Sequence, residues 1–443
     1  MYLLTDGLTV GQQIVLLALF TVVFLVGVYS LDLWFLTLAS FLAKRGEGRA
    51  PAISDWPKIT IQLPFYNEAR VASRILESCL SLDYPRDRLE IVVIDDSNDG
   101  TSEIVEKYRE RFAPLIKVVG RRKRDGLKAG ALTEALKVSD GEFISVFDAA
   151  YLPSRYLLKR MVPYLYLGED VAFVQARWGY IDDSFSWYAK AVALAIDIYG
   201  LVDQIARFSL GLVPHFNGTA AIFRKSAVER VGGWSPETLA EDLDLSIRLK
   251  LHGYTHVYLP WIVCPGEIPH TFRNLRAQQY RWARGFTECL KKYWVPILRS
   301  KRLSIMKKVE SLVYLQSYLM PLLSLIGIAC GAVYFTIFPS NFYLDHLKDS
   351  LLLALHLLFS AISYTAPLAS ATAAISMYDG GFREKVGKAV NLALLVLFFY
   401  SMLLTYSKAA IDALIGGRGE FVRTPKTGLR RVFAVSRAGG SGG

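Results

Sequence analysis

Apolar residues are concentrated towards the two ends of the chain, and this distribution constrains the fold more than any other feature. Residues from about 13 to 42 are almost all apolar, whereas the stretch from about 51 to 293 has the composition of an ordinary globular domain. Three further apolar stretches follow, at about 312–338, 351–377 and 390–404. Each is long enough to cross a bilayer, the last only just. The pattern therefore predicts a globular domain inserted between membrane spans.

Basic residues beside these stretches predict their orientation. Lys44 and Arg45 follow the first apolar run directly, and Lys307 and Lys308 precede the second. Because basic residues favour the cytosolic side, we expect a multi-pass integral membrane protein, placed in the plasma membrane, with its central domain in the cytosol. The first run is expected to be a retained anchor, because it is longer than the apolar region of a signal peptide and no clear cleavage site follows it.

The number of C-terminal spans stays open at this stage. Three crossings after a cytosolic domain would place the basic tail outside the cell, which the positive-inside rule disfavours. One of the three stretches is therefore expected to be interfacial or re-entrant. We divide the chain into an N-terminal transmembrane anchor (1–48), a cytosolic domain with interface helices (49–300), a C-terminal transmembrane region (301–415) and a basic cytosolic tail (416–443). The last five residues, Gly-Gly-Ser-Gly-Gly, resemble an added linker.

Charge and cysteine content narrow the choice of partners. The formal net charge is +11, but the chain has no basic low-complexity arm and no zinc motif, so we expect no nucleic-acid partner. Lipid headgroups of the bilayer and phosphorylated substrates fit the basic residues better. The four cysteines are far apart and form no CxxC pair, so they predict reduced structural thiols rather than a metal site or a disulfide framework.

The central stretch predicts an α/β domain with a mostly parallel sheet. Strand-like runs at 58–63, 89–94, 116–119 and 143–147 alternate with helix-like patterns. Each run ends in polar or turn residues, and these ends are where an open α/β sheet binds its ligands. Apolar residues at helical spacing between 184 and 210 predict a helix that lies either in the core or on the bilayer surface.

Polar residues at the first two strand ends are candidates for a nucleotide site. Asn67 and Glu68 follow the first strand, and Asp95 and Asp96 end the second. Carboxylates in such positions can accept hydrogen bonds from a base N–H or from ribose hydroxyls, although a turn with an Asp cap explains the second pair equally well.

A cationic loop and a third acidic strand end follow. The loop from 121 to 130 has the sequence RRKRDGLKAG and includes Lys128; it suits a diphosphate, or it is a solvated basic turn. The strand at 143–147 leads into Asp148-Ala149-Ala150.

Three more motifs complete the series. Phe216-Asn217-Gly218-Thr219 precedes a predicted strand, and Ala240-Glu241-Asp242 begins a predicted helix, where a carboxylate can act as a general base or cap the helix. The most specific motif is Gln278-Gln279-Tyr280-Arg281-Trp282, whose amide, guanidinium and indole fall within about one and a quarter helical turns. The alternative for this last motif is an amphipathic interfacial helix.

Taken in order, these motifs resemble those of the inverting, processive family 2 glycosyltransferases of the cellulose synthase superfamily. The residues at 175–178, 216–219 and 278–282 are similar to those of plant mannan and glucan synthase-like proteins and their prokaryotic relatives. The resemblance covers roughly residues 64–282. It implies a GT-A-type glycosyltransferase domain packed against amphipathic interface helices and a transmembrane bundle.

The resemblance also implies roles for individual residues. Asp242 would be the catalytic base, with Glu241 beside it, and Asp148 would meet the diphosphate and a divalent metal, Mg²⁺ or Mn²⁺. A segment around 420–426 is similar to the loop that closes over the donor in this family, which makes Phe421, Arg423 and Thr424 gating-loop residues. The implied donor-binding residues are Asn67, Glu68, Asp95, Asp96, Lys128, Asp148, Gln278 and Arg281, and the implied acceptor-binding residues are Trp282, Phe216 and Asn217.

The predicted function is transfer of a hexose from a nucleotide sugar, of the UDP-glucose or GDP-mannose type, to a growing and β-linked polysaccharide. Two alternatives stay open. One is non-processive transfer of a single sugar to a lipid carrier or glycolipid. The other is a sugar-binding pseudoenzyme, because Ala150 stands where the family places a second metal-binding carboxylate and supplies no oxygen ligand. We hypothesise that Ala150 was introduced to disable turnover.

Overall fold

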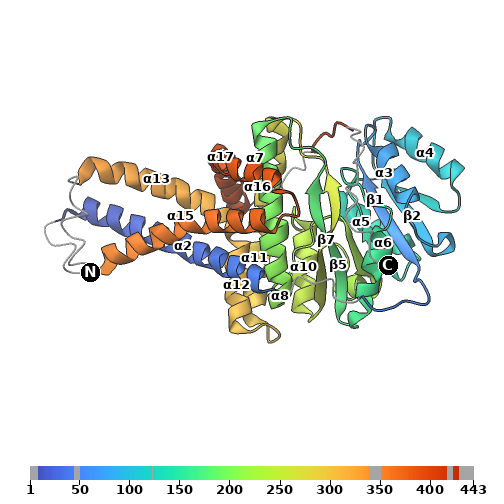
Figure 1. Ribbon diagram of the computed structural model, residues 1–443, viewed down its shortest axis with the longest axis horizontal. Coiled ribbons are helices and arrows are strands. Elements are labelled where there is room, and N and C mark those ends of the chain that lie inside the picture. Colours follow the sequence, from blue (N-terminus) through green and yellow to red (C-terminus); the bar gives the residue numbers. More distant parts are fainter. Residues whose placement is uncertain (1–7, 44–49, 122, 339–350, 417–422, 429–443) are drawn as a thin grey trace.

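A seven-stranded mixed sheet forms the centre of the α/β part (Figure 1). The computed structural model describes residues 8–43, 50–121, 123–338, 351–416 and 423–428. The strands lie in the order β3-β2-β1-β4-β6-β5-β7. Their bounds are Ile59–Phe65 (β1), Leu89–Asp95 (β2), Ile116–Gly120 (β3), Phe143–Val146 (β4), Val171–Tyr180 (β5), Ala221–Arg224 (β6) and Thr255–Gly266 (β7).

All strands except β6 run in one direction. β1 is parallel to β2 and β4, β2 is parallel to β3, and β5 is parallel to β7, whereas β6 is antiparallel to both of its neighbours. The predicted α/β class with a mostly parallel sheet is confirmed. The four predicted strands correspond to β1 to β4, within one or two residues at each end, because each is a short apolar run closed by polar residues.

Helices cover both faces of the sheet, and alternating strand residues supply one core on each side. On one face, Ile61 and Leu63 of β1 pack with Ile75 and Leu76 of α3 (Ala72–Leu80). On the other, Ile144 and Val146 of β4 pack with Leu132 of α5 (Leu127–Val138) and Leu245 of α10 (Glu241–Leu251). The other helices of this part are α4 (Thr101–Arg111), α6 (Leu157–Met161), α9 (Lys225–Arg230) and α11 (Phe272–Arg299), with short 3₁₀ turns at Arg86–Arg88 and Val162–Leu167.

The helix predicted between 184 and 210 is continuous but changes its pitch. It consists of α7 (Trp187–Ile198), a π-helical turn η3 (Tyr199–Asp203) and α8 (Gln204–Leu210). It lies beside the apolar helices, because α8 packs on α2 and α7 packs on α17.

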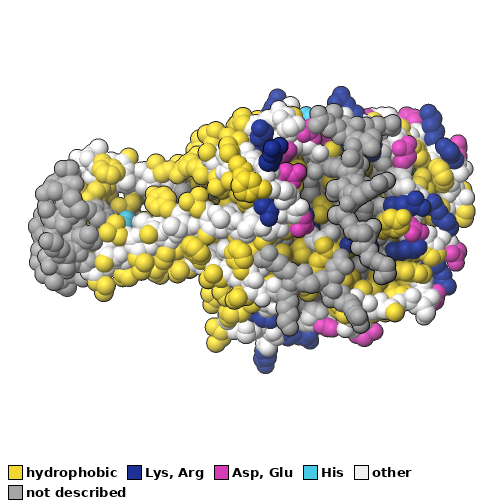
Figure 2. All heavy atoms as spheres, in the orientation of Figure 1, with side chains coloured by type: hydrophobic (Ala, Val, Ile, Leu, Met, Phe, Trp, Pro, Cys, Tyr) yellow, Lys and Arg dark blue, Asp and Glu magenta, His cyan; other side chains and the backbone are white. Residues whose placement is uncertain are grey.

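Four helical stretches of the described chain are long and apolar enough to cross a membrane: Val10–Leu42, Ile305–Ile337, Leu351–Met377 and Phe382–Ile415. They comprise α2 (Val10–Leu42), α12 (Ile305–Leu315), η4 (Ser317–Leu319), α13 (Met320–Ile337), α15 (Leu351–Met377), α16 (Phe382–Val390) and α17 (Leu392–Ile415). Figure 1 shows α2, α13 and α15 extending together away from the sheet. In Figure 2 this extension is covered mainly by hydrophobic side chains, while charged side chains gather on the α/β part.

The last apolar stretch is longer than expected. Its helix α17 has 24 residues rather than being barely long enough to span, and it lies against α7 and α11, whereas α2, α13 and α15 extend together (Figure 1). α17 runs in the same direction as α11. Arg276 Nε near the start of α11 lies 3.1 Å from Thr405 Oγ1, and Lys291 Nζ further along α11 lies 2.8 Å from the carbonyl of Ala413. The sequence predicts where the apolar run lies. It does not predict the polar contacts of α17, because their partners on α11 are more than a hundred residues away in the chain.

Candidate functional site

Four predicted site residues meet at one point around the ammonium group of Lys128. Lys128 lies in the first turn of α5, and its Nζ lies 2.8 Å from Oδ1 of Asp148 and 3.3 Å from Oε1 of Glu241. It also donates a hydrogen bond of 2.9 Å to the carbonyl of Gly218. The cation therefore joins the end of β4, the start of α10 and the loop before β6.

The fourth member is Asp242, and Gly218 is what allows it to come this close. A Cβ on Gly218 would lie 3.0 Å from Oδ2 of Asp242 and 3.2 Å from Nζ of Lys128. The φ angle of Gly218 is +76°, which side chains other than glycine rarely adopt. Any larger residue here would push the loop away from the carboxylate.

Burial and mutual interaction shift the pKa values of this cluster. Burial lowers the pKa of Lys128, but the nearby Asp148, Glu241 and Asp242 outweigh it, and the net direction is upwards. Burial raises the pKa values of Asp242 and Glu241, and Lys128 partly offsets the rise. Burial also lowers the pKa of Arg281, against the opposing pull of Glu241, Asp148 and Asp242. The cluster thus combines cations with carboxylates that protonate more readily than usual.

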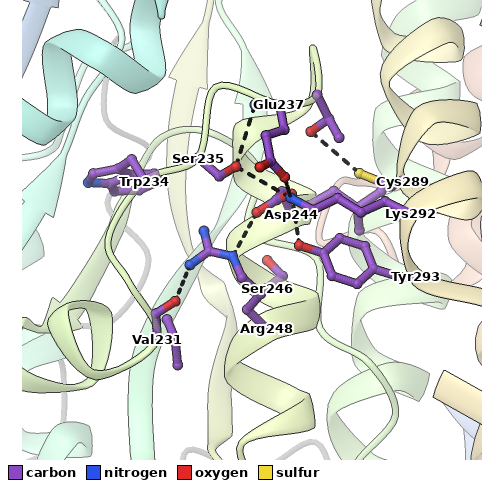
Figure 3. A network of polar contacts seen from close by, with 12 residues as sticks. Val231, Trp234, Ser235, Glu237, Asp244, Ser246, Arg248, Cys289, Lys292 and Tyr293 are labelled. Atoms are coloured by element: carbon purple, nitrogen blue, oxygen red, sulfur yellow. Dashed lines mark hydrogen bonds and ion pairs between the residues drawn. The ribbon is translucent and has the colours of Figure 1, made fainter. Parts of the chain in front are cut away.

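A buried network behind the site fixes α10 to α11 (Figure 3). The fully buried carboxylate of Asp244 accepts from Arg248 Nε at 2.7 Å, Lys292 Nζ at 2.6 Å and Tyr293 OH at 2.9 Å. Arg248 also donates to the carbonyl of Val231. Because Asp242 lies on α10 and Arg281 on α11, this network holds the carboxylate and the guanidinium of the site in one frame.

The predicted base and ribose residues form a second, adjoining group. Asp96 pairs with Arg121 in a two-point contact in which Nε lies 2.9 Å from Oδ1, and the two side chains are only 6% exposed. Asp95 accepts from the Ser97 amide at 3.1 Å. Asn67 Oδ1 accepts from the Asn98 amide at 2.8 Å, which ties the ends of β1 and β2 together.

Glu68 contacts the C-terminal segment. Its carboxylate lies 3.0 Å from Arg423 Nη2 and 2.7 Å from Lys426 Nζ. Thr424 is 9% exposed, whereas Phe421, the third predicted gating-loop residue, lies outside the described residues. The segment is held further by Glu267, whose Oε2 accepts from the Thr427 amide at 2.9 Å. A residue predicted to bind the donor and one predicted to close over it are therefore in direct contact.

An aromatic wall adjoins the cluster, and the sequence analysis identified only one of its members. The ring of Trp282 on α11 lies 5.8 Å from that of Trp178 at the end of β5. Trp178 is stacked on Tyr151 at 5.6 Å and lies 6.0 Å from Tyr199. Tyr151 directly follows the Asp148-Ala149-Ala150 motif, and Trp178 is the last residue of the segment 175–178. An aromatic residue close to the ligand end of a strand was therefore the signal that could have predicted both.

Two further predicted residues are Phe216, which lies in the core, and Gln278, which is partly exposed on α11. Phe216 is fully buried and packs on Phe173, Phe223 and Trp234, so the predicted acceptor contact is not supported; its aromatic ring belongs to the core between β6 and α10. Gln278 is half-buried on α11, one turn before Arg281.

A divalent metal would depend on Asp148. Among the described residues no group of three or more His, Cys, Asp or Glu side chains is placed to hold a metal ion. The Asp148 side chain is 34% exposed, and Ala150 is buried and offers no ligand. One carboxylate together with substrate phosphates and water is a usual coordination for Mg²⁺, so the site fits a metal that binds with a diphosphate.

The domain has a mixed α/β sheet with acidic strand ends, a basic residue in the first turn of α5 and an acidic pair at the start of α10. It is joined to long apolar helices. These features together define a membrane-attached glycosyltransferase-type domain. A family model described as "Glycosyl transferase family 2" matches residues 60–232, and one described as "Glycosyl transferase family group 2" matches residues 151–406, more than half of the chain. The chain belongs to glycosyl transferase family group 2, and the predicted resemblance to family 2 enzymes is confirmed.

Named relatives agree with this family. Glucomannan 4-beta-mannosyltransferase 1 of Oryza sativa subsp. japonica is 36% identical over 264 residues, covering 58% of this chain and 51% of the relative. Glucomannan 4-beta-mannosyltransferase 2 of Arabidopsis thaliana is 36% identical over 263 residues, covering 58% and 49%. The chain thus spans about half the length of the curated relatives it matches.

One solved structure has the same fold. It is the mannosyltransferase PcManGT from Pyrobaculum calidifontis in complex with GDP-Man and Mn²⁺, with a TM-score of 0.60 and 22% sequence identity, covering 89% of this chain and 99% of that one. The predicted GT-A-type fold is confirmed.

Proposed function

We propose that this protein is an inverting hexosyltransferase that moves a sugar from a nucleotide-sugar donor to a growing, β-linked glycan. The observation that carries the proposal is the meeting of Lys128, Asp148 and the acidic pair Glu241-Asp242 at the ligand edge of the sheet, beside Arg281. The relatives named as glucomannan mannosyltransferases and the GDP-Man in PcManGT make GDP-mannose the first donor to test and UDP-glucose the second.

The reaction is a single displacement at the anomeric carbon. Asp242 removes the proton from an acceptor hydroxyl while that oxygen forms a bond to the anomeric carbon. The bond from this carbon to the diphosphate breaks at the same time, and the leaving diphosphate keeps the electron pair. Lys128 and Arg281 stabilise the charge that develops on it. Attack opposite the leaving group inverts the anomeric configuration.

The adjoining residues bind the rest of the donor. Asn67, Asp95 and Asp96 lie at the ends of β1 and β2, where base and ribose would be held, and Gln278 lies on the same helix as Arg281. Asp148 would hold Mg²⁺ or Mn²⁺ together with the donor phosphates, and the ion would supply charge neutralisation. Loss of a second carboxylate at Ala150 weakens this binding, so the chain as it stands turns over slowly.

The acceptor lies on the aromatic side of the cluster. The faces of Trp282 and Trp178 can support the C–H surface of a sugar ring, because aromatic faces pack well against such surfaces. Asn217, which precedes Gly218, brings a buried amide to the same place. The proposed acceptor site therefore keeps the predicted Trp282 and Asn217, gains Trp178 and omits Phe216.

The membrane placement follows from the position of α17 and the C-terminal segment. Arg423 and Lys426 contact Glu68 of the α/β domain, so the chain returns to the side of that domain after α17. With α2, α13 and α15 as the crossings and α16–α17 at the interface, the parity agrees with a cytosolic domain and tail. The division at residues 48, 300 and 415 and a plasma-membrane location are part of the same proposal.

An apolar patch with basic neighbours seats the domain on the bilayer. Exposed apolar side chains at the end of α11 and the start of α12 include Trp294, Ile305 and Val309, which are 51%, 81% and 56% exposed. Lys301 and Arg302 lie between them in the chain and are exposed. Such a surface suits the headgroup region of an anionic leaflet.

The C-terminal segment is the proposed gate. Arg423 and Thr424 lie over the predicted donor side, where Glu68 holds the segment by two ion pairs. Opening and closing of this contact would control entry of the nucleotide sugar.

The test is a donor screen in the Ala150→Asp background, measuring release of each nucleoside diphosphate and the length of the glycan product. We expect release from GDP-mannose or UDP-glucose, with at least about a hundredfold loss in Asp242→Asn, the usual scale for losing a general base. Asp87→Asn, at an exposed carboxylate, is the matched control. Equal rates in the two variants would refute the assignment of Asp242.

The same assay separates the alternatives. A ladder of products supports the polymerase, and a single added sugar supports transfer to a lipid carrier. Release in the Ala150→Asp background, with only nucleotide-sugar binding when Ala150 is kept, supports a pseudoenzyme.

A further inference from the structure

A chain of hydrogen bonds links the acceptor side of the site to the first membrane-facing helix after the domain. Its centre is Tyr199, the first residue of the π-helical turn η3. Such wide turns inside α-helices occur often at functional sites. The turn brings the Tyr199 hydroxyl to the loop that contains His215 and Asn217, and its ring to Trp178.

Tyr199 and Tyr314 both contact the same histidine nitrogen. Nδ1 of His215 lies 2.9 Å from the hydroxyl of Tyr199 and 2.7 Å from the hydroxyl of Tyr314, which belongs to α12. The Tyr199 hydroxyl also donates to Oδ1 of Asn217 at 2.5 Å. The order of the chain is therefore Tyr314, His215, Tyr199, Asn217.

The protons can be assigned consistently along this chain. Burial lowers the pKa of His215 to about 3, so the ring is neutral at working pH and carries one proton. With that proton on Nδ1, both tyrosine oxygens accept from His215, and Tyr199 uses its own proton for Asn217. The bonds from His215 to Tyr199 and from Tyr199 to Asn217 then point towards the site, and the bond from His215 to Tyr314 points towards α12.

The far end of the chain is fixed by buried charges. Arg207 of α8 is fully buried, and its Cζ lies 3.3 Å from the centre of the Tyr314 ring. Arg207 pairs with Asp203 of the π-helical turn at 2.9 Å and with Glu310 of α12 at 2.8 Å. Removing Arg207 would leave both carboxylates, including the buried Glu310, without their shared counter-charge, so this clamp holds α12 against the turn.

The near end leaves one donor unused. Asn217 is 4% exposed and its Oδ1 is taken by Tyr199. Its Nδ2 is itself enclosed by neighbouring atoms and has no hydrogen-bond partner among the described residues. An unpaired buried donor is unfavourable, so a sugar hydroxyl that reaches Nδ2 as the loop before β6 moves aside would relieve the cost. The next residue, Gly218, is the one that approaches both Asp242 and Lys128.

We propose that Tyr199, His215 and Tyr314 are positioning residues that orient the Asn217 amide, so that its Nδ2 donates to a hydroxyl of the acceptor sugar beside the catalytic base. The proposal rests on the proposed function, because it names what binds the acceptor at that site. It makes acceptor affinity, rather than donor affinity, depend on the contact between α12 and the loop.

The test compares three tyrosine variants that each lose one oxygen atom. Tyr199→Phe and Tyr314→Phe interrupt the chain, whereas Tyr318→Phe is the matched control, because Tyr318 follows α12 and packs on Phe286 and Tyr406 without taking part in the chain. Binding of β-1,4-linked mannotetraose to the detergent-solubilised protein is measured by tryptophan fluorescence, and donor binding by titration with GDP-mannose.

We expect Tyr199→Phe and Asn217→Ala each to weaken mannotetraose binding about tenfold, Tyr314→Phe to weaken it less, and donor binding to stay within about twofold in all variants. The double variant Tyr199→Phe/Asn217→Ala should bind no more weakly than Asn217→Ala, because Tyr199 acts through Asn217. Tyr318→Phe should behave as the parent.

Three results would overturn the proposal: no mannotetraose binding by the parent, unchanged binding in Tyr199→Phe, or additive losses in the double variant. The readout is independent of turnover. If the donor screen finds no release from any donor while the binding pattern holds, the proposed enzymatic function fails and the positioning role stands.

Discussion

Replacing Asp244 by asparagine tests whether the network behind the site holds α10 and α11 together. The substitution keeps the size of the side chain and removes its charge. Arg248 and Lys292 would then lose their shared buried counter-charge, although Lys292 keeps Glu237 as a partner.

The size of the effect follows from burial. Breaking a buried ion pair by removing one partner costs about 3–5 kcal/mol. Asp244 is fully buried, but the side chains of Arg248 and Lys292 are 15% and 26% exposed, which favours the lower end. At roughly 2–4 °C per kcal/mol for a domain of this size, a loss of about 3 kcal/mol lowers the midpoint of thermal unfolding by about 6–12 °C.

The assay is thermal unfolding of both proteins in the same detergent, followed by intrinsic fluorescence at one scan rate. Glu237→Gln is the matched control, because it removes another partner of Lys292 from a side chain that is 68% exposed. An exposed pair is worth less than about 1 kcal/mol, so this control should shift the midpoint by no more than about 4 °C. Equal shifts for the two variants would refute the reasoning that burial of Asp244 sets the cost.

Three further predictions concern the site and its attachment. Ala150→Asp should raise metal-dependent transfer strongly, because it adds an oxygen ligand near Asp148; equal rates over a Mn²⁺ titration with Ala and Asp would show that position 150 is not a ligand position. Since burial, partly offset by Lys128, raises the pKa of Asp242, the base is active above that raised pKa and is lost as the pH falls through it. On the acidic side of the pH–rate profile, the rate should therefore fall at a pH above about 4, the usual pKa of an Asp side chain. A fall at or below that pH would contradict the burial argument. Lys388→Met removes an ion pair of 2.6 Å with the buried Asp197, so hydrogen exchange in α16 should accelerate; unchanged exchange there would mean that this pair does not anchor the helix.

Local patterns in the sequence predicted much of the fold. Strands β1 to β4 are short apolar runs closed by polar residues, and α2 and α15 are continuous apolar runs, so each could be read without knowing its neighbours. The position of α17 could not be read, because an apolar helix that spans a bilayer and one that packs on α11 have the same composition. The contacts that separate them, such as Tyr406 OH with Gln279, join residues 127 positions apart.

The candidate site divides in the same way. Lys128, Asp148, Glu241 and Asp242 were predicted from motifs, and the structure brings them together. Phe216 was misassigned because an aromatic residue next to a ligand loop has the same signature whether it faces the ligand or the core. The pairing of Asp96 with Arg121 was not predicted either, since it depends on how two loops fold over the sheet.

The one reversed strand, β6, determines where the chain tolerates insertions. Because β6 runs against its neighbours, the residues before it arrive at the reactive edge, and those after Arg224 leave at the opposite edge. Extra residues between Asn217 and Ala221 would separate the loop from the base. The Gly232-Gly233 turn that follows α9 belongs to the far edge, so a short peptide epitope or a fluorophore attached there would give a handle for immobilising or tracking the molecule without obstructing the sugar.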